Sequence, residues 1–271
     1  MVLRVFSFGG GVQSTAALVL AVQRKIDYRV FLFANVGEDS ENPHTLDYIS
    51  EYAGPYAQRH GIELIELRKE RRDKQPETVH SRLTKPGSRS IGIPVRMSSG
   101  APARRACTLD FKIRVVAKWL KAHGATEQSK AVVGIGFSTD EVERTGSAFD
   151  ERIPWQIKEY PLLRPLYLSR NDCINLVLQA GLPQPPKSAC WFCPYHSPLE
   201  WQRMHREEPE QFAKACDLED FVNARRARLG KDHVYFTRFM KPLRELFAAG
   251  TQLTMDELMW RHGCDSGYCW R

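Results

Sequence analysis

Short β-type apolar runs alternate with helix-type patterns through about the first 140 residues, and this alternation constrains the fold more than any other feature. Four runs of strand length cover residues 2–8, 29–34, 62–67 and 131–137. Between them, apolar residues recur at helical spacing at 14–23, 43–60 and 108–123, the last with Thr108 as N-cap. Strands that alternate with helices form βαβ units. The sequence therefore predicts an α/β fold, with a doubly wound, mostly parallel sheet and helices on both faces.

The second half of the chain is predominantly helical in pattern. Helix-type stretches cover residues 169–180, 199–206, 210–229 and 254–262. We therefore expect an α/β domain at residues 1–165 and a helical C-terminal region at residues 166–271. Residues 68–105 show neither pattern, and a loop of that length in a compact domain is usually functional, which favours a substrate lid.

Composition excludes several classes of protein. The 271 residues are 42% hydrophobic and 26% charged, which is ordinary for a globular protein. No stretch approaches the roughly 18 apolar residues of a membrane span, and the N-terminus lacks a secretion signal. We therefore expect a cytoplasmic protein with no membrane partner, whose seven cysteines are reduced thiols used in catalysis or metal binding. A secreted disulfide scaffold, a membrane protein and a disordered chain are excluded.

Positive charge is concentrated in one segment. The whole chain carries a formal charge of +7, whereas residues 68–114 contain 13 Lys and Arg against four acids, a net charge of +9. Clustered positive charge suits a polyanion, either a nucleotide phosphate or a nucleic-acid backbone. A solvated surface without a ligand is the alternative interpretation.

A glycine-rich loop separates the first strand from the first helix. Glycines let the backbone approach a phosphate, and a helix N-terminus offers free N–H groups and the positive end of the helix dipole. The loop lacks the lysine of a Walker A motif, and a glycine-rich turn without a ligand is the alternative. The candidate nucleotide-binding residues here are Ser7, Gly9, Gly10, Gly11, Gln13, Ser14 and Thr15.

This loop resembles the PP-loop (Ser-Gly-Gly-x-Asp-Ser) of ATP pyrophosphatases, in the version found in the phosphoadenosine phosphosulfate reductase family. Gly9 stands where that motif has Ser, and Gln13 stands where it usually has Asp. Residues 33–37 resemble the end of the family's second strand, and residues 134–141 resemble a later glycine segment. The resemblance covers residues 2–196 and implies an adenine nucleotide α-hydrolase-like fold, a nucleotide-binding domain at 1–165, and nucleotide contacts from Phe33, Ala34 and Gly136.

The cysteines form a second pattern. Cys190 and Cys193 make a C-x-x-C, which alone is ambiguous between zinc, iron–sulfur and redox chemistry. Cys107 lies among arginines at an expected helix start, where a thiolate is stabilised. The sequence resembles iron–sulfur adenylylsulfate reductases, in which a vicinal cysteine pair and a later C-x-x-C hold a [4Fe-4S] cluster. The resemblance implies that Cys107, Cys190 and Cys193 are metal ligands, with zinc as the alternative.

Two tail cysteines, Cys264 and Cys269, are the candidate catalytic residues. They could supply a further metal ligand, or receive and relay sulfur from a chain end that reaches the site.

The resemblance implies two chemistries. In the first, an ATP pyrophosphatase uses ATP and Mg²⁺ to adenylate an acceptor, and a sulfur nucleophile then displaces AMP. We expect this sulfur transferase to act on nucleic acid, and we favour DNA as the acceptor, in DNA phosphorothioation, over tRNA. The expected sulfur donor is a cysteine desulfurase. A homodimer is possible in this interpretation. The alternative is an adenylylsulfate or phosphoadenylylsulfate reductase that forms sulfite. A zinc-containing nucleic-acid-binding module is a third interpretation, which the glycine loop disfavours.

Overall fold

The computed structural model describes residues 2–145 and 153–247 of the chain. Its centre is a five-stranded sheet in the order β3-β2-β1-β5-β6, in which each neighbouring pair is parallel. The predicted α/β fold with a mostly parallel sheet is therefore confirmed. The strands are β1 (Arg4–Phe8), β2 (Val30–Asn35), β3 (Glu63–Arg68), β5 (Ala131–Ile135) and β6 (Gln156–Glu159).

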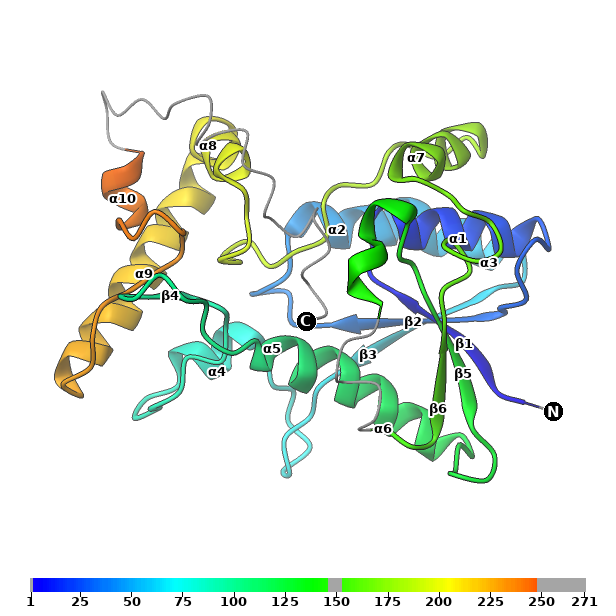
Figure 1. Cartoon of the computed structure of the whole chain (residues 1–271), viewed down its shortest axis with the longest axis horizontal. Coiled ribbons are helices and arrows are strands. Elements are labelled where there is room, and N and C mark those ends of the chain that lie inside the picture. Colours follow the sequence, from blue (N-terminus) through cyan, green and yellow to red (C-terminus); the bar gives the residue numbers. More distant parts are fainter. Residues whose placement is uncertain (1, 146–152, 248–271) are drawn as a thin grey trace.

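Helices cover both faces of the sheet (Figure 1). One face carries α1 (Val12–Val22), α2 (Pro43–Tyr48), α3 (Gly54–Arg59) and α7 (Arg170–Gln179), and the other carries α6 (Arg114–Ala122). Phe31 and Phe33 of β2 belong to the cluster under α1, whereas Leu32 belongs to the cluster under α6. Successive strand side chains point to opposite faces, so an uninterrupted apolar run is what a sheet buried on both faces requires.

Two of the expected helices contain a π-helical turn. The stretch expected at 43–60 runs as α2, a π turn at Ile49–Ala53 and α3, with Pro55 as the second residue after the turn. A proline nitrogen cannot donate the helical hydrogen bond, so the regular pattern is interrupted there. The expected helix start at Thr108 was wrong, because the helix begins with α5 (Ala106–Thr108) and continues through a π turn at Leu109–Ile113 into α6.

The edge strand β6 was not predicted. It pairs in parallel with β5 through four residues, Gln-Ile-Lys-Glu, of which only Ile157 is apolar. Ile157 is 49% exposed, so this strand is held by its backbone ladder more than by burial of side chains. A pattern search based on apolar residues has nothing to detect in such a segment.

Residues 68–105, expected as a lid, instead build part of a second lobe. They form α4 (Val79–Thr84) and β4 (Arg96–Met97), which pairs antiparallel with β7 (Val234–Tyr235). Their apolar side chains are buried in one cluster with α8 (Pro198–Glu207), α9 (Pro209–Arg228) and α10 (Leu243–Leu246). The residues of the segment that are buried in this cluster are Val79, Leu83, Ile93 and Val95. The lid expectation was therefore wrong.

Glu219 of α9 stabilises this lobe from its interior. It is 1% exposed, and its carboxylate accepts hydrogen bonds from the backbone N–H groups of Phe236 and Leu243, both at 2.6 Å. Burial raises the pKa of the Glu219 carboxyl to about 7, against the effect of these two hydrogen bonds. The segment from Phe236 to Leu243 is thus held on α9 by a group that titrates near neutral pH.

The division of the chain at residue 165 stays a prediction. Two packing observations concern it: α7 follows that point but packs on α1, and residues 79–111 precede it but share a cluster with residues 191–247. The helix expected at 254–262 lies outside the described residues. Among the described helices, none has both the length and the apolar character of a membrane span.

Candidate functional site

A cavity of about 200 Å³ lies at the carboxyl ends of β1, β2 and β5. The chain leaves β1 toward β2 on one side and returns later to β5 on the other, so this is the topological switch point of the sheet. Ligands of open α/β sheets bind in such crevices. Of the predicted nucleotide-binding residues, the wall includes Ser7, Gly9, Gly11, Gln13, Ser14, Phe33, Ala34 and Gly136.

Gly10 and Thr15, also predicted to bind nucleotide, shape the loop from behind the cavity wall. Gly10 has φ +77°, and a Cβ there would lie 2.7 Å from Cγ2 of Thr45, so the turn requires glycine. Thr15 is fully buried, and its hydroxyl donates to the Gly11 carbonyl at 3.0 Å, as does the hydroxyl of Ser14. The hydroxyls predicted to meet a phosphate are thus bonded to the loop itself.

The start of α1 supplies backbone donors to the cavity. Gly11 is the N-cap, its backbone is extended, and no side chain caps the helix. The first N–H groups of a helix have no partner within it, and they carry the positive end of the dipole. A Cβ at Gly9 would have no heavy atom within 4 Å, so the space above the loop is open to a ligand.

Gln13 lies between an acidic side chain, Glu141, and a basic one, Arg170, neither of which the sequence analysis named as a site residue. Its Nε2 donates to Oε2 of Glu141 at 3.3 Å, and Nη1 of Arg170 donates to its Oε1 at 3.5 Å. All three residues line the cavity, and Glu141 is 4% exposed. Glu141 lies four residues after the fourth predicted strand, at the end of the segment 134–141 that resembles the family, and Arg170 opens the 169–180 helix; these were the sequence signals available for them.

Basic side chains complete the wall. Besides Arg170, the cavity is lined by Arg105 and Lys112, from the helical segment at residues 105–113, and by Lys187. Nζ of Lys187 lies 2.5 Å from the Glu200 carboxylate. Four cationic groups around one small cavity favour an anionic ligand, such as the phosphates of a nucleotide.

Much of the charge of segment 68–114 is compensated locally. Arg68 pairs with Glu38, and the guanidinium of Arg82 lies 2.6 Å from the carboxylates of both Glu77 and Asp110. The segment therefore presents a weaker positive surface than its sequence suggests.

The fold brings together the three cysteines predicted to bind metal. Cys107, Cys190 and Cys193 line the same cavity as the glycine loop, although Cys107 is more than 80 residues from the other two. Burial raises the pKa of the Cys193 thiol to about 11 and that of the Cys190 thiol well above its ordinary value. The positive charges of Arg105 and Lys112 partly oppose these shifts.

The other described cysteines lie elsewhere. Cys173 is buried in the cluster under α1 and Cys216 in the second lobe, and burial raises the pKa of their thiols to about 12 and about 11. Cys264 and Cys269, the candidate catalytic residues, lie outside the described residues.

Within residues 2–145 and 153–247, no three His, Cys, Asp or Glu side chains are grouped so as to hold a metal ion. The donor chemistry of the cavity nevertheless fits a thiolate-bound metal. Three thiols are soft ligands that suit iron–sulfur clusters and zinc, and a bound cation offsets the cost of ionising a buried thiol. A four-ligand centre requires one donor in addition to these three.

The chain matches no protein-family model and no curated protein. Its structure is similar to phosphoadenylyl-sulfate reductase from Candida auris in a phosphate complex. The identity is 14%, the match covers 68% of this chain and 76% of that chain, and the TM-score is 0.43. It is also similar to U34-tRNA thiolase NcsA from Methanococcus maripaludis with its [4Fe-4S] cluster. Here the identity is 14%, the match covers 82% of this chain and 72% of that chain, and the TM-score is 0.42.

Proposed function

We propose that this protein is a PP-loop-type ATP pyrophosphatase that acts as a sulfur transferase. One observation carries the proposal: the backbone of the glycine loop and the thiols of Cys107, Cys190 and Cys193 line the same cavity. A phosphate-binding loop next to three thiols is the arrangement needed to activate an acceptor with ATP and then to replace oxygen with sulfur.

In the proposed reaction, the N–H groups at the start of α1 and the basic wall bind the phosphates of ATP. An oxygen of the acceptor attacks the α-phosphorus, pyrophosphate leaves, and the acceptor carries AMP. A sulfur nucleophile then attacks the activated acceptor, and AMP leaves with the former acceptor oxygen. Gln13 and Glu141 are oxygen donors suited to Mg²⁺ beside the phosphates.

The three thiols would hold a [4Fe-4S] cluster, which would supply an iron at which incoming sulfide can bind. Zinc is the alternative metal. Cys264 and Cys269 are proposed to relay sulfur from the donor, for which we propose a cysteine desulfurase. One thiol accepts the persulfide sulfur and the other thiol attacks that persulfide, so that sulfide leaves as a Cys264–Cys269 disulfide forms, which an added thiol reductant reduces.

For the acceptor we propose nucleic acid, with the DNA backbone ahead of tRNA, so that the reaction is DNA phosphorothioation. The excess of positive charge on the chain, +7, supports a polyanionic partner. A cytoplasmic location and a homodimer remain predictions.

The test is an assay of anaerobically purified protein with ATP, in the presence and absence of DNA or tRNA. The proposal expects AMP and pyrophosphate in equal amounts, with sulfur appearing in the nucleic acid when a desulfurase and cysteine are added. The competing reductase predicts no cleavage of ATP but release of sulfite from adenylylsulfate, driven by thioredoxin. Thioredoxin-driven sulfite formation would overturn the proposal.

A further inference from the structure

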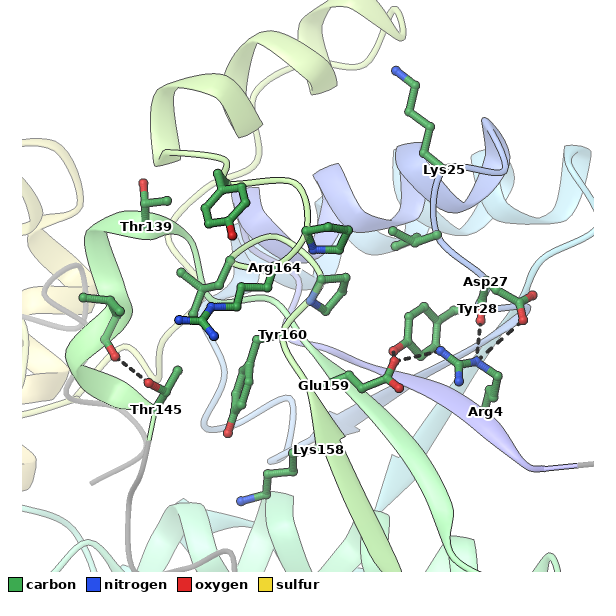
Figure 2. Close-up of a pocket in the computed structure, with 16 residues that line it drawn as sticks. Arg4, Lys25, Asp27, Tyr28, Thr139, Thr145, Lys158, Glu159, Tyr160 and Arg164 are labelled. Atoms are coloured by element: carbon green, nitrogen blue, oxygen red, sulfur yellow. Dashed lines mark hydrogen bonds and ion pairs between the residues drawn. The ribbon is translucent and has the colours of Figure 1, made fainter.

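A second and larger cavity, of about 850 Å³, lies outside the edge strand β6 and beside the end of α1 (Figure 2). Figure 2 shows Arg164 and Tyr160 near its middle, Thr139 and Thr145 at one end, and Arg4 with Tyr28 at the other. Its volume is within the roughly 300–1,000 Å³ that is typical of ligand sites.

This cavity adjoins the glycine-loop cavity. The 3-10 helix Thr139–Arg144 forms the wall between them, since Glu141 lines the first cavity whereas Thr139 and Val142 line the second. The chain also connects the two cavities over a short stretch, because Arg164 lines the second cavity and Arg170 lines the glycine-loop cavity. A long ligand held in the second cavity would therefore pass close to the site at which ATP is proposed to bind.

Aromatic rings form part of the wall. The ring of Tyr160 is stacked on Phe137, with 5.5 Å between centroids and an interplanar angle of 12°, so its orientation is fixed. Tyr167 also lines the cavity, is 68% exposed and has φ +50°, a backbone conformation that is costly for a bulky residue. An exposed tyrosine in this conformation offers a flat face for stacking.

The charges of the cavity are unbalanced. Its two acids, Asp27 and Glu159, are paired with Arg4 at 3.6 and 2.7 Å, and Glu159 also accepts a hydrogen bond from Tyr28 at 2.6 Å. Among the described residues, the other cations on the wall are Lys25 and Arg164, together with Lys158, which has a partner of its own. Arg4 carries one positive charge against two carboxylates, and Lys25 and Arg164 add two more, so the described wall keeps a net positive charge and attracts anions.

We propose that this second cavity binds a single-stranded segment of the nucleic-acid acceptor, with a base stacked on Tyr167 and phosphates on Arg164 and Lys25. A basic groove with aromatic platforms is how proteins bind single strands. A duplex can place a base against this ring only by extruding the base from its stack, which costs unstacking energy that a single strand does not pay. The proposal rests on the proposed function for its nucleic-acid acceptor, and it names the form and the entry point of that acceptor.

The experiment measures binding of a fluorescently labelled oligonucleotide of about six nucleotides, short enough to occupy one site, by anisotropy. Tyr167→Ala should weaken binding about fivefold to a hundredfold, the worth of one stacked base. Arg164→Gln should make the salt dependence shallower by about 0.7 in log–log slope, the contribution of one phosphate contact to a single strand. Both side chains are exposed, and an unchanged unfolding temperature verifies the fold.

Matched controls lie outside the cavity. Tyr52→Ala removes another exposed tyrosine, and Arg228→Gln another exposed arginine, and both should bind as the wild type does. A triple variant, Arg71→Gln with Arg72→Gln and Lys74→Gln, tests the alternative basic surface of segment 68–114. It should leave binding of the short oligonucleotide nearly intact.

The outcomes separate the two proposals. Wild-type binding with no effect of Tyr167→Ala or Arg164→Gln would overturn the second cavity as the site and leave the nucleic-acid acceptor standing. Equal displacement of the oligonucleotide by inorganic polyphosphate and by unlabelled strand, with Tyr167→Ala unaffected, would show charge attraction alone and would also overturn it. Formation of AMP and pyrophosphate without binding of any strand or duplex would instead remove the nucleic-acid acceptor itself. Equal binding of the matching duplex would overturn the single-strand claim.

Discussion

Gly9 and Gly10 test the nucleotide site directly, because the structure predicts different consequences for side chains at these adjacent positions. Gly9 lines the cavity and a Cβ there meets no heavy atom within 4 Å, so a side chain would extend into the space proposed for phosphate. A Cβ at Gly10 would lie 2.7 Å from Cγ2 of Thr45 and 3.1 Å from Cδ1 of Ile49. Gly9→Val should therefore remove binding without loss of stability, and Gly10→Ala should lose stability.

The expected magnitudes follow from these environments. A Cβ at Gly9 meets no heavy atom within 4 Å and the residue has no left-handed backbone, so the free energy of unfolding of Gly9→Val should stay within about 0.5 kcal/mol of the wild type. For Gly10→Ala, the left-handed backbone costs about 1–2 kcal/mol and the crowding against Thr45 about 1–3 kcal/mol. The sum of about 2–5 kcal/mol corresponds to a fall in Tm of roughly 4–20 °C for a chain of this size.

Calorimetry provides both measurements, by titration with a non-hydrolysable ATP analogue and by thermal unfolding of the same preparations. We expect Gly9→Val to weaken nucleotide binding at least tenfold at an unchanged Tm. Tight binding of the analogue by this variant would refute the assignment of the glycine loop as the phosphate site. A Gly10→Ala protein that unfolds at the wild-type temperature would refute the description of the turn.

Three further outcomes follow from the site and the second lobe. Cys190→Ser should lower the iron content and visible absorbance of anaerobically purified protein, whereas Cys216→Ser should preserve both; similar iron in the two variants would remove the thiol assignment. The folded-state pKa of Glu219, about 7, exceeds its ordinary value of 4.5, so the stability due to this group is greatest below pH 4.5 and falls by about 3 kcal/mol as the pH rises through 7. In urea unfolding from pH 5 to pH 8, the wild type should lose about 2–3 kcal/mol relative to Glu219→Gln, and a constant difference would contradict the buried titration. Cys264→Ser and Cys269→Ser should retain formation of AMP and pyrophosphate but lower sulfur incorporation, and full incorporation in both variants would exclude them as relays.

Local patterns were sufficient for the parts of the fold in which one segment carries its own signal. The runs that became β2 and β5 are buried along nearly their whole length, so almost every residue in them is apolar, whereas β1 and β3 combine apolar residues with partly exposed polar ones. The glycine loop was recognisable because a φ of +77° at Gly10 is accessible to glycine at little cost. The C-x-x-C was recognisable because its two cysteines are close in the chain.

Features made by contacts between distant segments could not be predicted. β6 has one apolar residue and exists because β5 offers it a backbone ladder. Residues 68–105 appeared to be a loop because their buried side chains are irregularly spaced, and their partners, α8 and α9, lie more than 90 residues further along the chain. Both cases depend on burial against a partner that no local window of sequence contains.

The candidate site likewise has features that the sequence predicted and features that only the structure revealed. The sequence by itself determined the chemical groups: a glycine loop, three thiols and an excess of cations. Only the tertiary structure decided that Cys107 lies on the same cavity wall as Cys190 and Cys193, and that Gln13 lies between Glu141 and Arg170. Chemical identity belongs to each residue, whereas proximity arises when packing of the sheet and the second lobe brings separate segments together.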